Sequence, residues 1–155
     1  MMRGKQSPKR SILPDPKYSN VTVAKFTHYL MRKGKKSVAQ KIVYGCFDQI
    51  QQAGQDPMAV FDAAIRNVSP ILEVKSRRIG GANFQVPIPV RVERKMMLAS
   101  RWIIEAAKSR KGQPMAKKLA QELTEASQNQ GTAIKKKTDV HRMAEANRAF
   151  AHFAR

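Results

Sequence analysis

The sequence predicts a mainly α-helical protein: a six-helix bundle with a protruding two-stranded β-hairpin inserted between the third and fourth helices. Apolar residues recur at helical spacing in six segments, whereas the stretch at about 72–90 alternates between apolar and polar residues. The chain has 155 residues, of which 42% are hydrophobic, and this suffices for one core of ordinary domain size. We therefore expect a basic N-terminal arm over 1–17 and a single helical domain over 18–155.

The N-terminal arm shows no helical or strand pattern, because prolines interrupt its polar and basic sequence at Pro8, Pro14 and Pro16. The first helix is expected over about 21–33. Asn20 is a suitable N-cap for this helix, and Gly34 is typical of the position just after a helix.

The next two helices have clear start and stop signals. Ser37 is the expected cap of the second helix, which should end near Gly54. The third helix should begin with Asp56 as its cap and Pro57 at its first position, and it should stop before Pro70. Three helices are therefore expected before the alternating stretch.

After Pro70 the apolar period changes from 3.6 residues to 2, which predicts two strands joined by a turn at 80–83. Pro87 and Pro89 lack N–H groups and lie two residues apart, so the edge they share is a poor one for pairing with another strand. The hairpin should remain two-stranded. Each arm spans roughly 23 Å at seven residues, so we expect the hairpin to project beyond the helical body, which should not need its tip.

Helical spacing resumes in the last third of the chain. The fourth helix is expected over about 92–110, with Trp102 on its apolar stripe. Pro114 should open the fifth helix, which ends before Gly131. Thr132 is the expected cap of a sixth helix that runs almost to the C-terminus.

The charge pattern favours a polyanionic partner. Thirty Lys and Arg against eleven Asp and Glu give a formal net charge of +19. Asp15 is the only acid among residues 1–45, whereas residues 46–72 carry Arg66 against three aspartates and are the poorest candidates for touching an anion. The basic residues form five clusters: 32–36, 75–78, 91–95, 108–111 and 135–137. Any one cluster is explained by a solvated face, but five together favour a bound polyanion.

Several other classes of function lack their signals. The fragment 34–37 resembles the end of a nucleotide-binding P-loop, but Tyr29 stands five residues before Gly34, where that motif needs its first glycine. Cys46 and the three histidines show no zinc-site spacing. No carboxylate pair or nucleophile arrangement indicates catalysis, so we expect no enzyme, cofactor or metal. A single cysteine, no long apolar run and no signal-peptide pattern favour a soluble protein of a reducing compartment. Sparse aromatic residues favour recognition of shape and phosphate geometry, with Phe84 and Tyr18 as candidate stacking exceptions.

Five stretches together resemble the family of bacterial-type small-subunit ribosomal protein seven. They are Leu13–Pro16, Gly34–Ser37, Glu73–Pro87, Arg101–Ile103 and Ala133–Phe153. The resemblance implies six helices with a long hairpin between the third and the fourth. It also implies a primary binder of the 3′ major (head) domain of small-subunit rRNA that nucleates head assembly, near the exit tRNA site and the mRNA path.

The implied partners are therefore small-subunit rRNA, neighbouring small-subunit ribosomal proteins, and the exit-site tRNA and mRNA nearby, with no membrane. The implied location is the cytoplasmic small ribosomal subunit, and an organellar ribosome is not distinguished from it. The family's RNA-contacting motifs carry over to Lys9, Arg10, Lys35, Lys36, Lys75, Arg77, Arg78, Arg94, Lys95, Arg101, Met115, Lys136, Lys137 and Arg142.

Two alternatives come from other classes. A DNA-architectural protein is also basic and helical with a ribbon arm, but such proteins usually dimerise and carry a wedge residue at the ribbon tip. An RNA-modifying enzyme needs a cofactor loop or a catalytic constellation. Sedimentation with the small subunit at moderate salt distinguishes a ribosomal protein from both.

Overall fold

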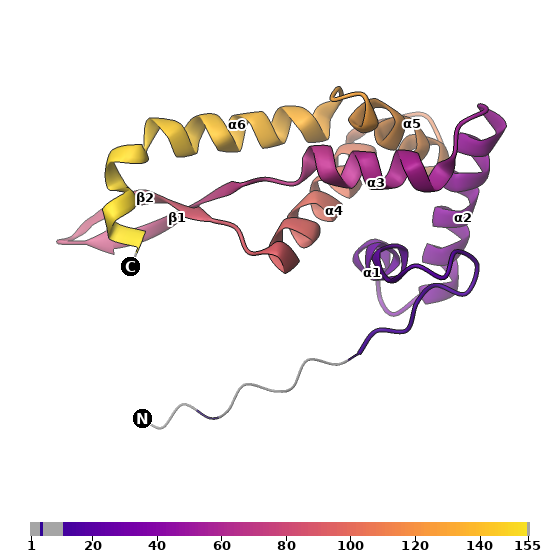
Figure 1. Cartoon of the computed structure of the whole chain (residues 1–155), viewed down its shortest axis with the longest axis horizontal. Coiled ribbons are helices and arrows are strands. Elements are labelled where there is room, and N and C mark those ends of the chain that lie inside the picture. The colour runs from indigo at the N-terminus through magenta and orange to yellow at the C-terminus, as the bar shows by residue number, and fades with distance from the viewer. Residues whose placement is uncertain (1–3, 5–10, 155) are drawn as a thin grey trace.

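The computed structural model describes residue 4 and residues 11–154, and it confirms a mainly helical protein with a two-stranded hairpin between the third and fourth helices (Figure 1). Seven helices are present in the described residues, because a 3-10 helix follows the six α-helices. The elements in chain order are α1 (Val21–Leu30), α2 (Lys36–Gln52), α3 (Pro57–Val68), β1 (Leu72–Ile79), β2 (Ala82–Pro89), α4 (Val92–Ser109), α5 (Met115–Ser127), α6 (Thr132–Ala146) and the 3-10 helix η1 (Arg148–Ala154).

Two of the predicted caps are confirmed and two are wrong. The side chain of Asn20 accepts from the Thr22 N–H at 2.6 Å, and that of Asp56 accepts from the Met58 N–H at 3.0 Å. Ser37, in contrast, lies inside the first turn of α2, whose N-cap Lys35 makes no side-chain cap bond. Thr132 is the first residue of α6 and its N-cap is Gly131, so Thr132 is not the cap.

The first helix ends at Leu30, earlier than the predicted residue 33. The backbone leaves the helical region at Met31, where ψ is 137°. Lys33 and Gly34 then adopt positive φ values of 50° and 73°, which a right-handed helix does not accommodate. The segment 31–35 is therefore a tight turn, and Lys33 pays a conformational cost there that Gly34 does not.

The core lies among α1–α5. Phe26, Phe47 and Phe61 are fully buried, and their rings meet edge to face at centroid distances of 5.3 and 5.6 Å. Trp102 is 9% exposed and packs against this core, as its place on the apolar stripe predicts. The chain before α1 is attached to α2 through Asp15, which is 3% exposed and accepts from the Tyr44 hydroxyl at 3.0 Å.

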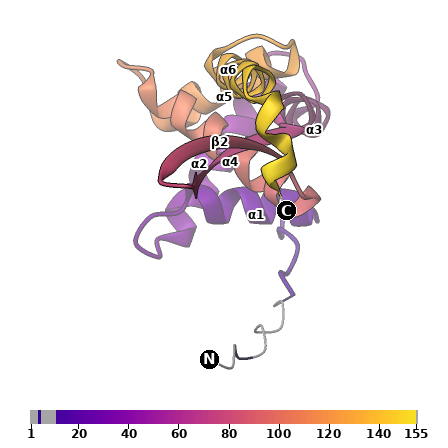
Figure 2. The same cartoon turned by 90° about the vertical axis from the view of Figure 1, so that its left-hand side faces the viewer.

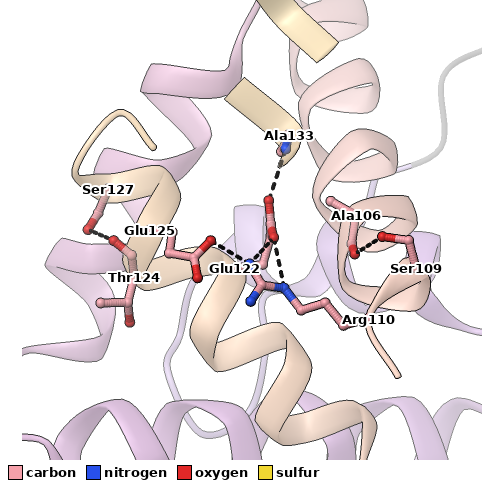
Figure 3. Close-up of polar contacts among 8 residues, drawn as sticks. All are labelled: Ala106, Ser109, Arg110, Glu122, Thr124, Glu125, Ser127 and Ala133. Carbon is pink, nitrogen blue, oxygen red and sulfur yellow. Dashed lines mark hydrogen bonds and ion pairs between the residues drawn. The ribbon is translucent and has the colours of Figure 1, made fainter. Parts of the chain in front are cut away.

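A polar cluster joins α4, α5 and α6 (Figure 3). Glu122 on α5 is fully buried, and its Oε2 accepts from Arg110 Nε at 3.1 Å and Nη2 at 2.6 Å. Its Oε1 accepts from the Ala133 N–H at 2.9 Å, so Glu122 caps the start of α6 from another helix. Glu125 also accepts from Arg110. A Cβ on Gly131, where φ is +93°, would stand 3.0 Å from carboxylate oxygens of both glutamates, so this position requires glycine.

The hairpin is antiparallel, with a register that runs from Leu72 opposite Pro89 to Ile79 opposite Ala82. Only Gly80 and Gly81 lie outside the strands, with φ values of 57° and 92°, so the turn is shorter than the predicted 80–83. The hairpin extends from the helical body toward the left of Figure 1. No third strand joins it within the part of the chain that the structure describes.

The sixth helix does not run almost to the C-terminus, as the sequence predicts, but ends at Ala146. Asn147 is the C-cap, and its side-chain Nδ2 donates to the Met143 carbonyl at 2.8 Å. The following 3-10 helix then lies against the hairpin (Figure 2). There the rings of Phe150 and Phe153 lie with their centroids 5.0 and 5.9 Å from that of Phe84. The hairpin is therefore covered along part of its length by the C-terminal segment.

Candidate nucleic-acid interface

Twelve of the fourteen predicted RNA-binding residues lie in the described part of the chain. Lys9 and Arg10 lie outside the described residues. Six of the other twelve form two groups, each at an open cavity near one end of α4. The remaining six lie on the hairpin, α4 and α6.

The first group surrounds an open cavity of about 460 Å³ between the base of the hairpin, α4 and α6, which we call the α4–hairpin cavity. Arg94 and Lys136 contribute its predicted cationic lining, and Lys75 joins them through an ion pair with Glu73. The apolar part of the lining comes from both helices and the hairpin: Val74, Leu98, Trp102, Val140 and Met143. The cavity therefore combines cations with an apolar lining.

Glu73 is the acidic residue of this cavity and is only 8% exposed. Its Oε2 accepts from Arg94 Nε at 2.8 Å, and its Oε1 lies 3.2 Å from Lys75 Nζ. Burial by itself raises the pKa of a carboxyl, but the hydrogen bonds from Arg94 and then Lys75 outweigh it, so the pKa of Glu73 is lowered. Glu73 is therefore ionised at neutral pH and links β1 to the first turn of α4.

The second group surrounds a smaller open cavity of about 280 Å³ at the other end of α4, which we call the turn cavity. Lys35 lines it from the α1–α2 turn, and Met115 lines it from the start of α5. Two further cations reach it, Arg32 and Lys108. Burial, followed by the positive charge of Arg32, lowers the pKa of Lys108, as expected for cations gathered without an equal number of anions. Lys36 follows at the first position of α2 and is exposed.

The two cavities lie along one rigid element. Arg94 and Lys108 are fourteen positions apart on α4, which at ~1.5 Å per residue places them about 21 Å apart along the helix axis. A spacing of this size spans several phosphates of a folded RNA and exceeds one small-molecule site. This arrangement fits a long polyanion better than a free nucleotide.

In three of the predicted residues the charged group contacts another part of the protein. Lys137 Nζ donates to the Asn67 carbonyl at 2.6 Å and so ties α6 to α3. Arg77 Nη1 donates to the Phe153 carbonyl at 2.8 Å and holds η1 on the hairpin. Arg142 is 81% exposed and pairs with Asp139 at 3.1 Å.

The remaining three, Arg78, Lys95 and Arg101, are exposed or half-buried on the hairpin and on α4. The two candidate stacking residues are occupied. Phe84 packs against η1, and Tyr18 packs edge-on against Phe47 with ring centroids 5.0 Å apart. The turn of the hairpin consists of Gly80 and Gly81 and presents no apolar wedge.

Three residues of these cavities were not predicted as site residues. Arg32 and Lys108 belong to basic clusters that the sequence does reveal, but their proximity depends on how α1 packs against α4. Glu73 was missed because an acidic residue is not expected at a phosphate-binding surface, and its ion pairs with Lys75 and Arg94 are known only from the structure. Conversely, Arg110 belongs to a basic cluster but is bound by Glu122 and Glu125.

Other chemistry finds little support in the described residues. They hold no group of three or more His, Cys, Asp or Glu side chains that could bind a metal. Burial raises the pKa of the Cys46 thiol to about 12, which leaves it unreactive at neutral pH. None of the described helices is long and apolar enough to cross a membrane.

Comparison with known proteins gives a consistent result. The sequence model of the family "Ribosomal protein S7p/S5e" matches residues 2–148. The chain is also 60% identical, over 154 residues, to the small ribosomal subunit protein uS7 of Burkholderia mallei (strain SAVP1), and the alignment covers 99% of each chain. The proteins of the same name from Burkholderia multivorans and Burkholderia thailandensis show the same identity and coverage.

Proposed function

Because this chain belongs to the ribosomal protein S7p/S5e family, we propose that it is a structural constituent of the small ribosomal subunit and a primary binder of the head domain of small-subunit rRNA. Binding would nucleate assembly of the head. The bound protein lies beside neighbouring small-subunit ribosomal proteins and near the exit tRNA site and the mRNA path. Its location is the cytoplasmic small ribosomal subunit, and its role is structural, without catalysis.

The observation that carries this proposal is the pair of cation-lined cavities toward the two ends of α4, whose cations Arg94 and Lys108 lie about 21 Å apart along the helix axis. Both are open, and both set basic side chains beside apolar surface. Such a combination suits a folded RNA, in which phosphates and exposed base faces alternate. The acidic segment 46–72 lines neither cavity.

Reconstitution tests the proposal. The full chain is mixed with small-subunit rRNA and the other small-subunit proteins, and the particles are sedimented at moderate salt. We expect the chain to travel with the small subunit and to bind a transcript of the head domain before other head proteins are added. Binding that is equally tight to an unrelated RNA of the same length, or to duplex DNA, would contradict the proposal and would favour a general nucleic-acid-binding protein.

A further inference from the structure

Glu73 is an anomaly for an RNA-binding surface. The chain carries a net charge of +19, yet a nearly buried carboxylate stands in the lining of its α4–hairpin cavity. If only net charge mattered, this acid would weaken the binding of phosphates. Its geometry indicates a different role, because both of its oxygens are engaged by cations that belong to the same surface.

The contact with Arg94 is specific in its atoms. Glu73 Oε2 accepts a hydrogen bond from Nε of the guanidinium. Within the described residues, the Arg94 side chain makes its hydrogen bond through this nitrogen. The two terminal nitrogens of Arg94, a planar fork suited to a phosphate, are therefore left for a ligand. The Arg94 side chain is 45% exposed, so solvent and ligands reach it.

The rigidity of the surroundings makes this orientation persistent. Glu73 lies on β1 opposite Ile88, where the two strands leave the helical body, and a hydrogen bond of 3.0 Å from Val90 N–H to the Ile71 carbonyl closes the base of the hairpin. Glu73 is 8% exposed and cannot swing into solvent freely. An exposed arginine without such a partner loses several rotamers on binding, whereas Arg94 has lost part of that freedom in advance.

We propose that Glu73 is a positioning residue for RNA: it fixes Arg94, and with it Lys75, as a preformed phosphate-binding fork at the α4–hairpin cavity. This inference rests on the proposed function, because its ligand is the head-domain rRNA. It makes a prediction of opposite sign to simple electrostatics. Removal of this acid weakens binding of the specific RNA even though it makes the protein more positive.

The test compares two variants that change the net charge equally. Glu73→Gln removes the carboxylate that holds Arg94 and Lys75. Asp62→Asn removes an exposed carboxylate on α3, away from both cavities. We expect Glu73→Gln to bind the head-domain transcript about tenfold more weakly than Asp62→Asn does, whereas both bind heparin at least as tightly as the parent. Glu73→Gln keeps the size of the side chain, so the fold should survive, and a thermal melt of each variant checks this. Its uncharged amide has a single acceptor oxygen and can no longer hold Arg94 and Lys75 together.

A second pair shows that Glu73 acts through Arg94. In an Arg94→Ala background, the further change Glu73→Gln should reduce the affinity for the transcript much less than it does in the parent, because only Lys75 is then left for Glu73 to hold. Equal or tighter binding of the transcript by Glu73→Gln, relative to Asp62→Asn, would overturn the inference. Failure of the proposed function looks different, because the parent protein itself would then not prefer the head-domain transcript over an unrelated RNA.

Discussion

Glu122 shows how one buried side chain determines the arrangement of three helices. It forms an ion pair with Arg110, which follows α4. It also accepts a hydrogen bond from an N–H in the first turn of α6 that has no acceptor within its own helix. Glu122→Ala leaves a buried N–H unpaired and Arg110 with Glu125 as its remaining carboxylate. We expect a loss of about 3 kcal/mol or more in the free energy of unfolding, measured by urea denaturation. Glu125→Ala, at a partly exposed position, is the control and should cost clearly less; equal losses would mean that burial is not the reason.

Trp102 has a mainly structural role, although it also lines the α4–hairpin cavity. Trp102→Ala removes a large side chain that is 9% exposed, and the cavity left behind should cost roughly 3–5 kcal/mol of stability. Thermal melting of the variant measures the loss. A variant that melts like the parent and yet binds RNA poorly would make Trp102 a recognition residue.

His141 gives the contact between α6 and the start of β1 a pH dependence. Its Nε2 accepts from the Ile71 N–H at 3.1 Å, which requires a neutral ring nitrogen. Burial, and then the charge of Lys137, lowers the pKa of His141 below its ordinary value of 6.5. The unfolded chain therefore takes up this proton at a higher pH than the folded one. The stability from the neutral ring is complete above pH 6.5 and is lost as the pH falls below that value.

We accordingly expect the free energy of unfolding to decrease as the pH falls below about 6.5, and His141→Gln to remove part of that decrease. Urea denaturation at several pH values measures it. His152→Gln, on η1, leaves the His141 contact in place and should retain the pH dependence. The account of His141 is wrong if the two variants and the parent share one pH profile.

The caps show what a local sequence predicts at the scale of residues. Asn20 and Asp56 cap their own helices through neighbours two residues away, so the pattern alone identifies them. The acceptor at the start of α6 comes from Glu122, which a pattern around Thr132 does not contain. The extended backbone of Met31, which ends α1 early, likewise has no signature in residue type.

At the scale of elements, the hairpin is less independent than its sequence indicates. Strand alternation and the proline pair predict a projecting two-stranded ribbon, and that ribbon is present. The 3-10 helix that covers it could not be predicted, because Phe150 and Phe153 pack on Phe84, a residue far away in the sequence. A replacement of the whole span 76–86 would remove Phe84 together with the fully buried Val86.

The tip and the base of the hairpin should therefore respond differently to shortening. Replacement of residues 78–83 by a two-residue turn removes mostly exposed residues, and we expect helical circular dichroism and melting close to those of the parent. Affinity for the head-domain transcript should fall only modestly, because no more than a few phosphate contacts are lost, mainly that of Arg78. Subunits rebuilt with this variant should retain exit-site tRNA less well. If the shortened chain folds but no longer binds the transcript, the main binding surface is the tip and not the ends of α4.

At the scale of the whole molecule, the net charge is a poor guide to which cations serve binding. Arg110 and Lys137 hold the bundle together, and Arg77 holds η1. Arg32, Lys35, Lys36, Arg94 and Lys136 stand at open surfaces instead. The sequence predicts the sign of the partner's charge and most members of this set. It does not predict their division between two cavities, because that depends on how α4 is packed against α1, α6 and the hairpin.

The affinity of the full chain for a head-domain transcript, measured over a series of salt concentrations, tests the central claim most directly. If the cations at both ends of α4 make about six to ten phosphate contacts, affinity should fall on the order of a thousandfold or more between roughly 50 and 200 mM salt. The logarithm of the binding constant should decrease linearly with the logarithm of the salt concentration. A nearly flat dependence would contradict the account, because binding would then not depend on the phosphate contacts that these two cavities supply.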